Sequence, residues 1–250
     1  MIALRSLAFN LALYLFTAIQ AIAGLPVLLM PRRTAYRFGR AWAAAILRLC
    51  AGIAGLGYEL RGGEHLPPGA AIIAMKHQSA WDTFAVAVIF DDPAIVLKKE
   101  LMWIPFYGWY LRKAGMIAID RKAGIHALRR LVASGERAAA LGRPIVIFPE
   151  GTRTAPGTHR PYQPGVAALY RQLDLPLVPV AVNSGVFWGR RSFLKRPGRI
   201  VVEILPPIPP GRERHQMMQE LERRIEAATA KLVEEARAKA NSRIDRARDS

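Results

Sequence analysis

Short apolar runs alternate with stretches of helical periodicity from Tyr58 onward, and this alternation strongly restricts the folds open to the chain. It is typical of an α/β sheet, in which covering helices separate buried strands. We therefore predict an α/β domain over residues 58–240. The strands are expected near 71–75, 94–97, 116–119, 144–148, 177–182 and 200–205, and the helices near 80–90, 101–113, 124–141 and 165–173.

The stretch Ala71–Asp82 joins one of these strands to a helix and carries a histidine and an aspartate five positions apart. At about 100° per residue, two such positions lie roughly 140° apart on a helix, so His77 and Asp82 cannot share a helical face. They can meet if His77 lies in the loop after the strand and Asp82 in the first turn of the helix. His77 would then be a general base oriented by Asp82. The simpler interpretation, which this stretch alone favours, is that Ser79-Ala-Trp-Asp82 only caps the helix.

Charged residues also follow two other apolar runs. Residues 144–153 read PIVIFPEGTR, in which Gly151 would let the backbone approach a ligand and Arg153 could bind a phosphate through two hydrogen bonds. Ile119-Asp120-Arg121 ends a shorter apolar run in the same way. Each loop alone could be an ordinary turn with a solvent-facing arginine. Together they indicate a ligand site, because α/β sheets bind ligands beyond the carboxyl ends of their strands.

The N-terminal segment is the most apolar part of the chain. Residues 6–30, interrupted by Asn10 and Gln20, exceed the ~20 residues that a helix needs to cross a ~30 Å hydrocarbon core. A second apolar stretch, 41–57, is expected to form an amphipathic helix that packs on the first or lies in the membrane interface. Residues 1–57 are thus expected to dock on a membrane, either as a single-pass anchor or as a helix hairpin that enters one leaflet.

Basic residues between the two apolar stretches suggest an orientation. A positive-inside bias would keep them, and the domain that follows, in the cytoplasm. They are Arg32, Arg33, Arg37 and Arg40. Cleavage as a signal peptide near Ala23 is disfavoured, because the apolar run continues past that point to Met30.

The composition and the absence of several motifs limit the classes of function that the chain could have. The 36 Lys and Arg residues against 19 Asp and Glu give a net charge of +17, which favours an anionic partner. A hydrophobic content of 52% favours a membrane over nucleic acid. Cys50, the single cysteine, is expected to be a buried thiol and not a zinc ligand. The sequence has no nucleophile elbow, P-loop or dinucleotide-binding glycine motif, so it does not support those chemistries.

The C-terminal part begins with a proline-rich connector at 206–210. Apolar residues then recur at helical spacing and predict an amphipathic helix packed on the domain. They are Leu221, Ile225, Ala228 and Leu232. Residues 241–250 are expected to form a polar tail.

Four motifs occur together in the order and rough spacing of a known family. They are His77 with Asp82, Ile119-Asp120-Arg121, Phe148-Pro-Glu-Gly-Thr-Arg153 and Val178-Pro-Val-Ala-Val182. Over residues 58–210 the chain resembles the glycerolipid acyltransferases. The resemblance implies a mixed, mostly parallel sheet flanked by helices, with an N-terminal membrane-docking segment.

The resemblance also implies an activity. A fatty acyl group would pass from acyl-CoA or acyl carrier protein to the sn-2 hydroxyl of 1-acyl-sn-glycerol-3-phosphate, a lysophosphatidic acid. The product would be phosphatidic acid, made in phospholipid biosynthesis at the cytoplasmic face of the inner membrane. No cofactor or metal is implied beyond the co-substrate.

Residue roles follow from the same resemblance, and they reverse the simpler interpretation of the His77 stretch. His77 matches the base that deprotonates the acceptor hydroxyl, and Asp82 matches the partner that stabilises the imidazolium. General-base help of this kind is worth about 10²–10⁴ in rate. The positions that match those binding the glycerol phosphate are Lys98, Arg121, Glu150, Gly151, Thr152 and Arg153.

Two departures from the family pattern leave the choice of acceptor open. Ala118 stands where an aromatic residue usually precedes Ile-Asp-Arg, and Tyr162-Gln163-Pro164 replaces a segment that often holds a lysine before Gly165. One alternative is acyl transfer to another lyso-lipid, such as a phosphate-free lyso-ornithine lipid. Another is a membrane lipid-binding protein of the same fold that has no catalytic activity.

Overall fold

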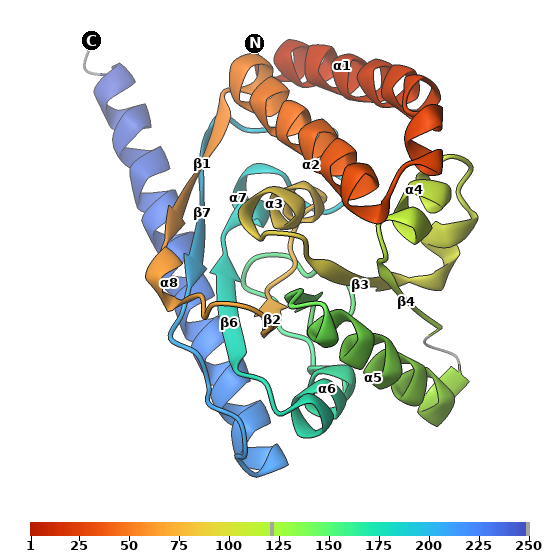
Figure 1. Ribbon diagram of the computed structural model, residues 1–250. Coiled ribbons are helices and arrows are strands. Elements are labelled where there is room, and N and C mark those ends of the chain that lie inside the picture. Colours follow the sequence, from red (N-terminus) through yellow and green to blue (C-terminus); the bar gives the residue numbers. More distant parts are fainter. Residues whose placement is uncertain (121–122, 249–250) are drawn as a thin grey trace.

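A seven-stranded, mostly parallel sheet lies at the centre of the molecule (Figure 1). The computed structural model describes the backbone of residues 1–120 and 123–248 and, within these ranges, the side chains up to residue 240. The strand order is β1-β7-β6-β2-β5-β3-β4, and all neighbouring pairs are parallel except β6 with β7. The strands are β1 (Leu56–Arg61), β2 (Ile72–Met75), β3 (Ala94–Lys98), β4 (Ile117–Ile119), β5 (Ile145–Ile147), β6 (Leu177–Val182) and β7 (Gly198–Ile204). The predicted mixed α/β sheet is confirmed.

Helices cover both faces of this sheet (Figure 1). They are α1 (Ile2–Ala23), α2 (Arg32–Leu49), α3 (Trp81–Ile89), α4 (Tyr107–Lys113), α5 (Gly124–Ala140), α6 (Gly165–Leu173), α7 (Ser184–Phe187) and α8 (Arg214–Arg248). The helices predicted near 80–90, 124–141 and 165–173 correspond to α3, α5 and α6, with ends that agree to within one residue.

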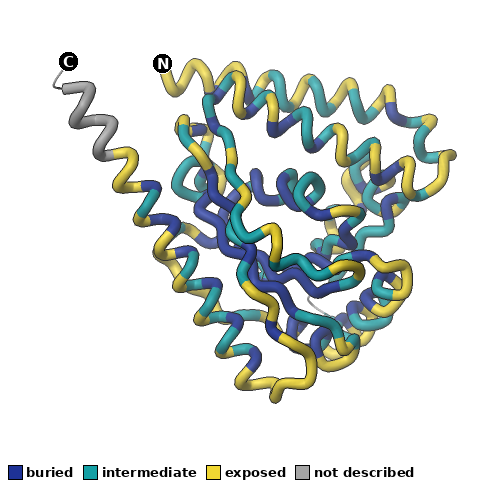
Figure 2. The backbone as a smooth tube through the Cα atoms, turned by 60° about the vertical axis from the view of Figure 1, so that its left-hand side comes forward, coloured by how far each residue is buried: buried dark blue, intermediate teal, exposed yellow. Residues whose placement is uncertain are grey.

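Alternation along the strands divides the core into two layers, because successive strand residues point to opposite faces. Ile73 and Met75 face the layer that includes α1, α2 and α3. Ile72 and Ala74 face the layer that includes α5, α6 and α8. Figure 2 shows the buried strands between these two layers of helices. The same alternation decides where the residues that follow β2 must point.

Strand β1 is absent from the prediction, and it begins at Leu56, so the expected boundary after residue 57 falls inside a strand. Its sequence, LGYELR, places a glycine and two charges among apolar residues and contains no continuous apolar run. Such a strand lies at an edge of the sheet, where one partner is enough. That partner is β7, which comes much later in the chain and could not be identified locally.

The prediction of one helix over 101–113 was wrong. A 3₁₀ turn covers Lys99–Trp103, and α4 starts only at Tyr107. Pro105 explains the break, because a proline disfavours helical backbone at the preceding residue and offers no N–H to the helix. Ile104 is accordingly extended, and Phe106 takes a positive φ of 61°.

Helices α1 and α2 form a hairpin that packs on the same side of the sheet as α3 (Figure 1). The indole N–H of Trp42 donates to Thr17 Oγ1 at 3.2 Å across the hairpin. The second helix begins at Arg32, nine residues before the stretch from which it was predicted, and its last turn ends at Gly55 in a left-handed conformation. In the described part of the chain, α1 alone is long and apolar enough to cross a membrane.

Helix α8 confirms the predicted amphipathic helix, since Leu221, Ile225 and Leu232 are fully buried against the sheet layer. It continues as a helix to Arg248, into the segment expected to be a polar tail. Backbone hydrogen bonds in a helix are local, so a helix that is stabilised on the domain can extend past it.

Cys50 is buried at the end of α2, as predicted. Burial raises the pKa of its thiol to about 12, so the side chain is a neutral packing group.

Candidate functional site

His77 lies in the loop between the central strand β2 and helix α3, as the sequence predicts. Its Nδ1 is 2.8 Å from Oδ2 of Asp82, which is fully buried in the first turn of α3. A carboxylate accepts hydrogen bonds, so Nδ1 carries the proton and Nε2 keeps a lone pair. The imidazole also stacks on the ring of Phe148, with centroids 4.0 Å apart. These two contacts fix the orientation of an imidazole that can accept a proton at Nε2.

Asp82 serves the helix start as well. Its Oδ2 accepts the backbone N–H groups of Gln78 at 2.7 Å and Ser79 at 2.8 Å. The Ser79 hydroxyl in turn accepts the N–H of Trp81 at 3.2 Å. The capping interpretation and the catalytic interpretation therefore describe one arrangement, in which a single carboxylate oxygen holds both the turn and the histidine.

The loop after β5 holds the backbone of His77 at both its N–H and its carbonyl. Glu150 Oε2 accepts the His77 N–H at 3.3 Å, and the Thr154 N–H donates to the His77 carbonyl at 2.9 Å. The Thr154 hydroxyl donates to Glu150 Oε1 at 2.6 Å and closes this arrangement. Because β2 and β5 are neighbours in the sheet, their two loops form one connected floor.

A buried cation lies beneath this floor. Lys76 is 1% exposed, and its Nζ donates to Glu150 Oε1 at 2.6 Å and to Glu226 Oε1 at 2.7 Å. The hydroxyl of Tyr162 donates to the same Glu226 oxygen at 2.9 Å. Burial and the nearby Glu226 raise the pKa of Tyr162, so it remains a neutral donor. A buried ammonium group is tolerated only when it is paired and hydrogen-bonded in this way.

Sequence reasoning missed Lys76 and Glu226. The available signal was the position of Lys76, directly after a fully buried strand and in phase with Ile72 and Ala74. That phase sends its side chain toward the α8 layer and away from the layer that His77 enters. The partner Glu226 lies 150 positions away, so no local pattern could identify it.

The geometry of Glu150 differs from that of a phosphate-binding residue. Its carboxylate points inward to Lys76, Thr154 and the His77 N–H, and it does not line the pocket at His77. A carboxylate directed at a phosphate would also repel it. Glu150 therefore supports the His77 loop, while the residues that follow it face the pocket.

A pocket of about 600 Å³ opens at His77. The sequence-predicted residues that line it are His77, Lys98, Gly151, Thr152 and Arg153. Gly151 has a φ of +68°, which lets the chain turn between the inward Glu150 and the outward Arg153. No Asp or Glu is among the described residues that line this pocket. Arg121, also expected here, lies outside the described residues.

A second cavity, of about 350 Å³, lies under the N-terminal hairpin. Aromatic and aliphatic side chains from α1, α2 and α4 form most of its wall. It shares lining residues with the His77 pocket, so the two cavities adjoin. The shared residues are Thr83, Ile95, Tyr107 and Leu111. The site thus offers an oriented imidazole in the wall of a basic pocket, and an apolar cavity adjoins that pocket.

Comparisons with known proteins identify the family of this chain. The profile of the family described as Acyltransferase matches residues 57–183. A 1-acyl-sn-glycerol-3-phosphate acyltransferase from Pseudomonas aeruginosa is 36% identical over 208 residues, which cover 83% of this chain and 81% of that protein. The alpha form of the mouse enzyme of that name is 29% identical over 158 residues, 62% of this chain and 55% of the mouse protein.

A solved structure shares the fold. The 1-acyl-sn-glycerophosphate acyltransferase PlsC from Thermotoga maritima superposes with a TM-score of 0.77 at 19% identity, over 93% of this chain and 98% of that one.

Replacing Lys76 by methionine is expected to lower the free energy of unfolding by roughly 3–5 kcal/mol, because Glu150 would keep a buried charge without its cation. Denaturant unfolding of the purified protein in detergent measures this loss. The double variant Lys76→Met/Glu150→Gln should recover part of it.

The matched control is Lys99→Met, which removes a half-exposed lysine that lies 3.2 Å from Asp120. A surface pair of this kind contributes less than about 1 kcal/mol. Equal losses for Lys76→Met and Lys99→Met would contradict the structural role of the buried pair.

Proposed function

This chain belongs to the acyltransferase family, and we propose that it transfers a fatty acyl group from an acyl thioester to the sn-2 hydroxyl of 1-acyl-sn-glycerol-3-phosphate, giving phosphatidic acid. The observation that carries the proposal is the His77–Asp82 pair, with Nδ1 and Oδ2 2.8 Å apart, in which His77 lines a basic pocket that adjoins an apolar cavity. The names of the Pseudomonas and mouse relatives support the same acceptor.

The chemistry needs only one base. Nε2 of His77 takes the proton of the acceptor hydroxyl while its oxygen attacks the thioester carbonyl. The new C–O bond forms, the C–S bond breaks, and the leaving thiolate takes the proton back from the imidazolium. Asp82 stabilises the imidazolium in between through its contact with Nδ1. The acyl group passes directly from donor to acceptor, so the reaction needs no protein nucleophile.

The basic pocket suits the phosphate of the acceptor. Arg153 and Lys98 come from the ends of β5 and β3 and line the pocket that contains His77. The guanidinium of Arg153 can bind a phosphate through two parallel hydrogen bonds, and the backbone at Gly151 allows close approach. The phosphate would be held while the glycerol hydroxyl reaches His77.

The apolar cavity suits a hydrocarbon chain. It adjoins the His77 pocket through Thr83 and Tyr107, so an acyl chain in it can present its thioester carbon near the base. Burial raises the pKa of Tyr107, so the shared wall stays uncharged. The donor is acyl-CoA or acyl carrier protein, both of which carry a thioester on a phosphopantetheine arm.

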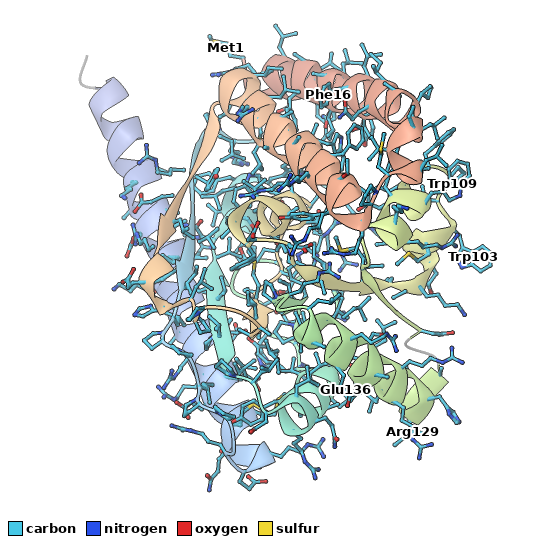
Figure 3. The ribbon with its side chains drawn as sticks, in the orientation of Figure 1. Met1, Phe16, Trp103, Trp109, Arg129 and Glu136 are labelled. Atoms are coloured by element: carbon cyan, nitrogen blue, oxygen red, sulfur yellow. The ribbon has the colours of Figure 1, made fainter. Side chains whose placement is uncertain are left out.

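The N-terminal hairpin supplies a surface for the membrane. Its exposed leucines and isoleucines follow helical spacing on one side of α1: Leu4, Leu7, Leu11, Leu15, Ile19 and Ile22. The opposite side contacts the domain through Ser6 and Phe9, both fully buried. Trp103 and Trp109 project outward at the neighbouring edge (Figure 3), where aromatic rings suit a lipid interface.

These contacts favour a hairpin that lies in one leaflet over a single-pass anchor. A membrane-spanning α1 would have to leave Phe9 and Ser6 without their partners in the domain. Arg32 binds the carboxylate of Asp92 through two hydrogen bonds, so part of the basic cluster ties α2 to the domain. The proposed location is the cytoplasmic face of the membrane, where acyl thioesters are made available.

Replacing His77 by alanine is expected to reduce acyl transfer by about 10²–10⁴, because the general base is lost. The measurement is radiolabelled acyl transfer to lysophosphatidic acid by the folded, purified enzyme. His126→Ala, which removes an exposed histidine on α5, is the control and should leave the rate unchanged. A His77→Ala enzyme within about tenfold of wild type would contradict the mechanism.

Arg153→Ala is expected to raise the KM for lysophosphatidic acid by about tenfold or more, since a charge-assisted contact with phosphate is lost. The same variant should barely change the KM of a phosphate-free acceptor such as lyso-ornithine lipid. The control is Arg129→Ala, which removes the same charge from the solvent face of α5 (Figure 3). If wild-type enzyme preferred the phosphate-free acceptor and ignored Arg153→Ala, the proposed acceptor would be wrong.

Leu11→Asp with Leu15→Asp is expected to weaken binding to anionic phospholipid vesicles by more than about tenfold, because two leucines no longer enter the lipid. Vesicle flotation measures the bound fraction. Ile125→Asp changes an equally exposed apolar residue on α5 and serves as the control. Unchanged flotation of the α1 variant would argue against docking through this surface.

A further inference from the structure

The connection between α7 and β7 carries two arginines that the proposed mechanism does not use. Arg190 and Arg191 are consecutive, and both line the pocket that contains His77. The neighbouring Arg196 and Arg199 do not line it. Arg190 and Arg191 therefore differ from the other arginines of this connection because they line the pocket, and the general basicity of the chain does not explain that position.

The pair lies at the tip of a tight turn. The N–H of Ser192 donates to the carbonyl of Gly189 at 3.1 Å, which makes Arg190 and Arg191 the two central residues. Arg191 has a φ of +57°, a conformation that favours glycine at this position of a turn. Backbone strain at a non-glycine residue is often found where a side chain must be presented to a ligand. An arginine that is retained in this conformation fits such a role.

The turn is firmly attached to the rest of the molecule. Lys195, 3% exposed, donates from Nζ to Asn10 Oδ1 at 2.6 Å and lies 4.8 Å from the centre of the Trp188 ring. Its backbone N–H donates to Ser6 Oγ at 2.9 Å. Burial lowers the pKa of Lys195. The tip of the turn therefore projects from a fixed base.

The cations of the pocket come from strands on both sides of β2. Lys98 is the last residue of β3, and Arg153 lies in the loop after β5; both strands lie on one side of β2 in the sheet order. The turn with Arg190 and Arg191 lies in the connection after β6, the neighbour of β2 on its other side. Two separate connections therefore bring cations to the pocket that contains His77.

The chemistry calls for two phosphate sites. The acceptor has a phosphate, and a thioester donor has another in its phosphopantetheine arm. Both molecules must meet at Nε2 of His77, and two anions repel each other unless cations bind each one separately. Arg153 and Lys98 are proposed to bind one anion, and Arg190 and Arg191 are the other arginines or lysines among the described residues that line the pocket.

We propose that Arg190 and Arg191 bind a phosphate of the acyl donor's phosphopantetheine-bearing end, separately from the acceptor phosphate at Arg153 and Lys98. This inference deepens the proposed function and rests on it. The ligand chemistry is a phosphate ester that is shared by two sources, coenzyme A and the prosthetic group of acyl carrier protein. The pair thus selects the donor, whereas Arg153 selects the acceptor.

The test measures, for variants of the whole chain, the KM for the acyl donor and the KM for the acceptor separately. Arg190→Ala/Arg191→Gly removes both charges, and glycine keeps the positive φ at position 191, so the turn is preserved. The KM for acyl-CoA is expected to rise by about tenfold or more, as for the loss of charge-assisted phosphate contacts, while the KM for lysophosphatidic acid changes by less than about twofold. Arg190→Lys/Arg191→Lys should recover most of the donor affinity.

Arg196→Ala is the matched control, since it removes an exposed arginine from the same connection without touching the pocket. It should leave both KM values near wild type. A rise in the acceptor KM instead of the donor KM would overturn the proposal, and so would two unchanged KM values.

A binding measurement separates this inference from the proposed function. Coenzyme A, and separately holo acyl carrier protein, is titrated calorimetrically into the His77→Ala enzyme with and without the arginine changes. Loss of binding for either donor supports the proposal and identifies the source of the phosphate. Unchanged binding of both overturns it. A different result would refute only the proposed reaction. In that case the wild-type enzyme would show no acyl transfer, yet coenzyme A would bind, and the arginine changes would abolish this binding.

Discussion

The alternation of side chains at the end of β2 is the constraint on which the rest of the site depends. Successive residues point to opposite faces, so Lys76 and His77 leave the strand in opposite directions. Lys76 enters the layer under α8 and is neutralised by Glu150 and Glu226, whereas His77 enters the layer of α3 and meets Asp82. A shift of register by one residue would exchange the two and place a lysine where the proposed base, His77, lies.

Glu150 links the two layers. One of its oxygens accepts a hydrogen bond from the ammonium group of Lys76, and the other accepts one from the backbone N–H of His77. The next residues turn outward at Gly151 and present Arg153 to the pocket. A single loop thus separates an inward anion, which supports the base, from an outward cation, which suits the acceptor. The C-terminal helix takes part in this arrangement through Glu226, although it is remote from the pocket in sequence.

The N-terminal hairpin has a similar double role. Ser6 and Asn10 are polar residues in a mostly apolar helix, and both contact Lys195. The helix with the exposed leucines therefore also holds the connection that places Arg190 and Arg191 at the pocket. The proposed lipid surface, donor site and base belong to one packed unit, because the apolar cavity lies between the hairpin and the pocket that contains His77.

Local sequence patterns were enough to predict the α/β architecture, the strands other than β1, the helices after β2, β4 and β5, and a loop geometry in which His77 could meet Asp82. These features depend on local periodicity, helix starts and the position of strand ends, all of which can be read from neighbouring residues. The contact between His77 and Asp82, the edge strand β1, the inward carboxylate of Glu150 and the pairing of Lys76 with Glu226 were established by the tertiary structure. All but the first depend on a partner far away in the chain, and burial makes such a partner energetically necessary without revealing which residue supplies it.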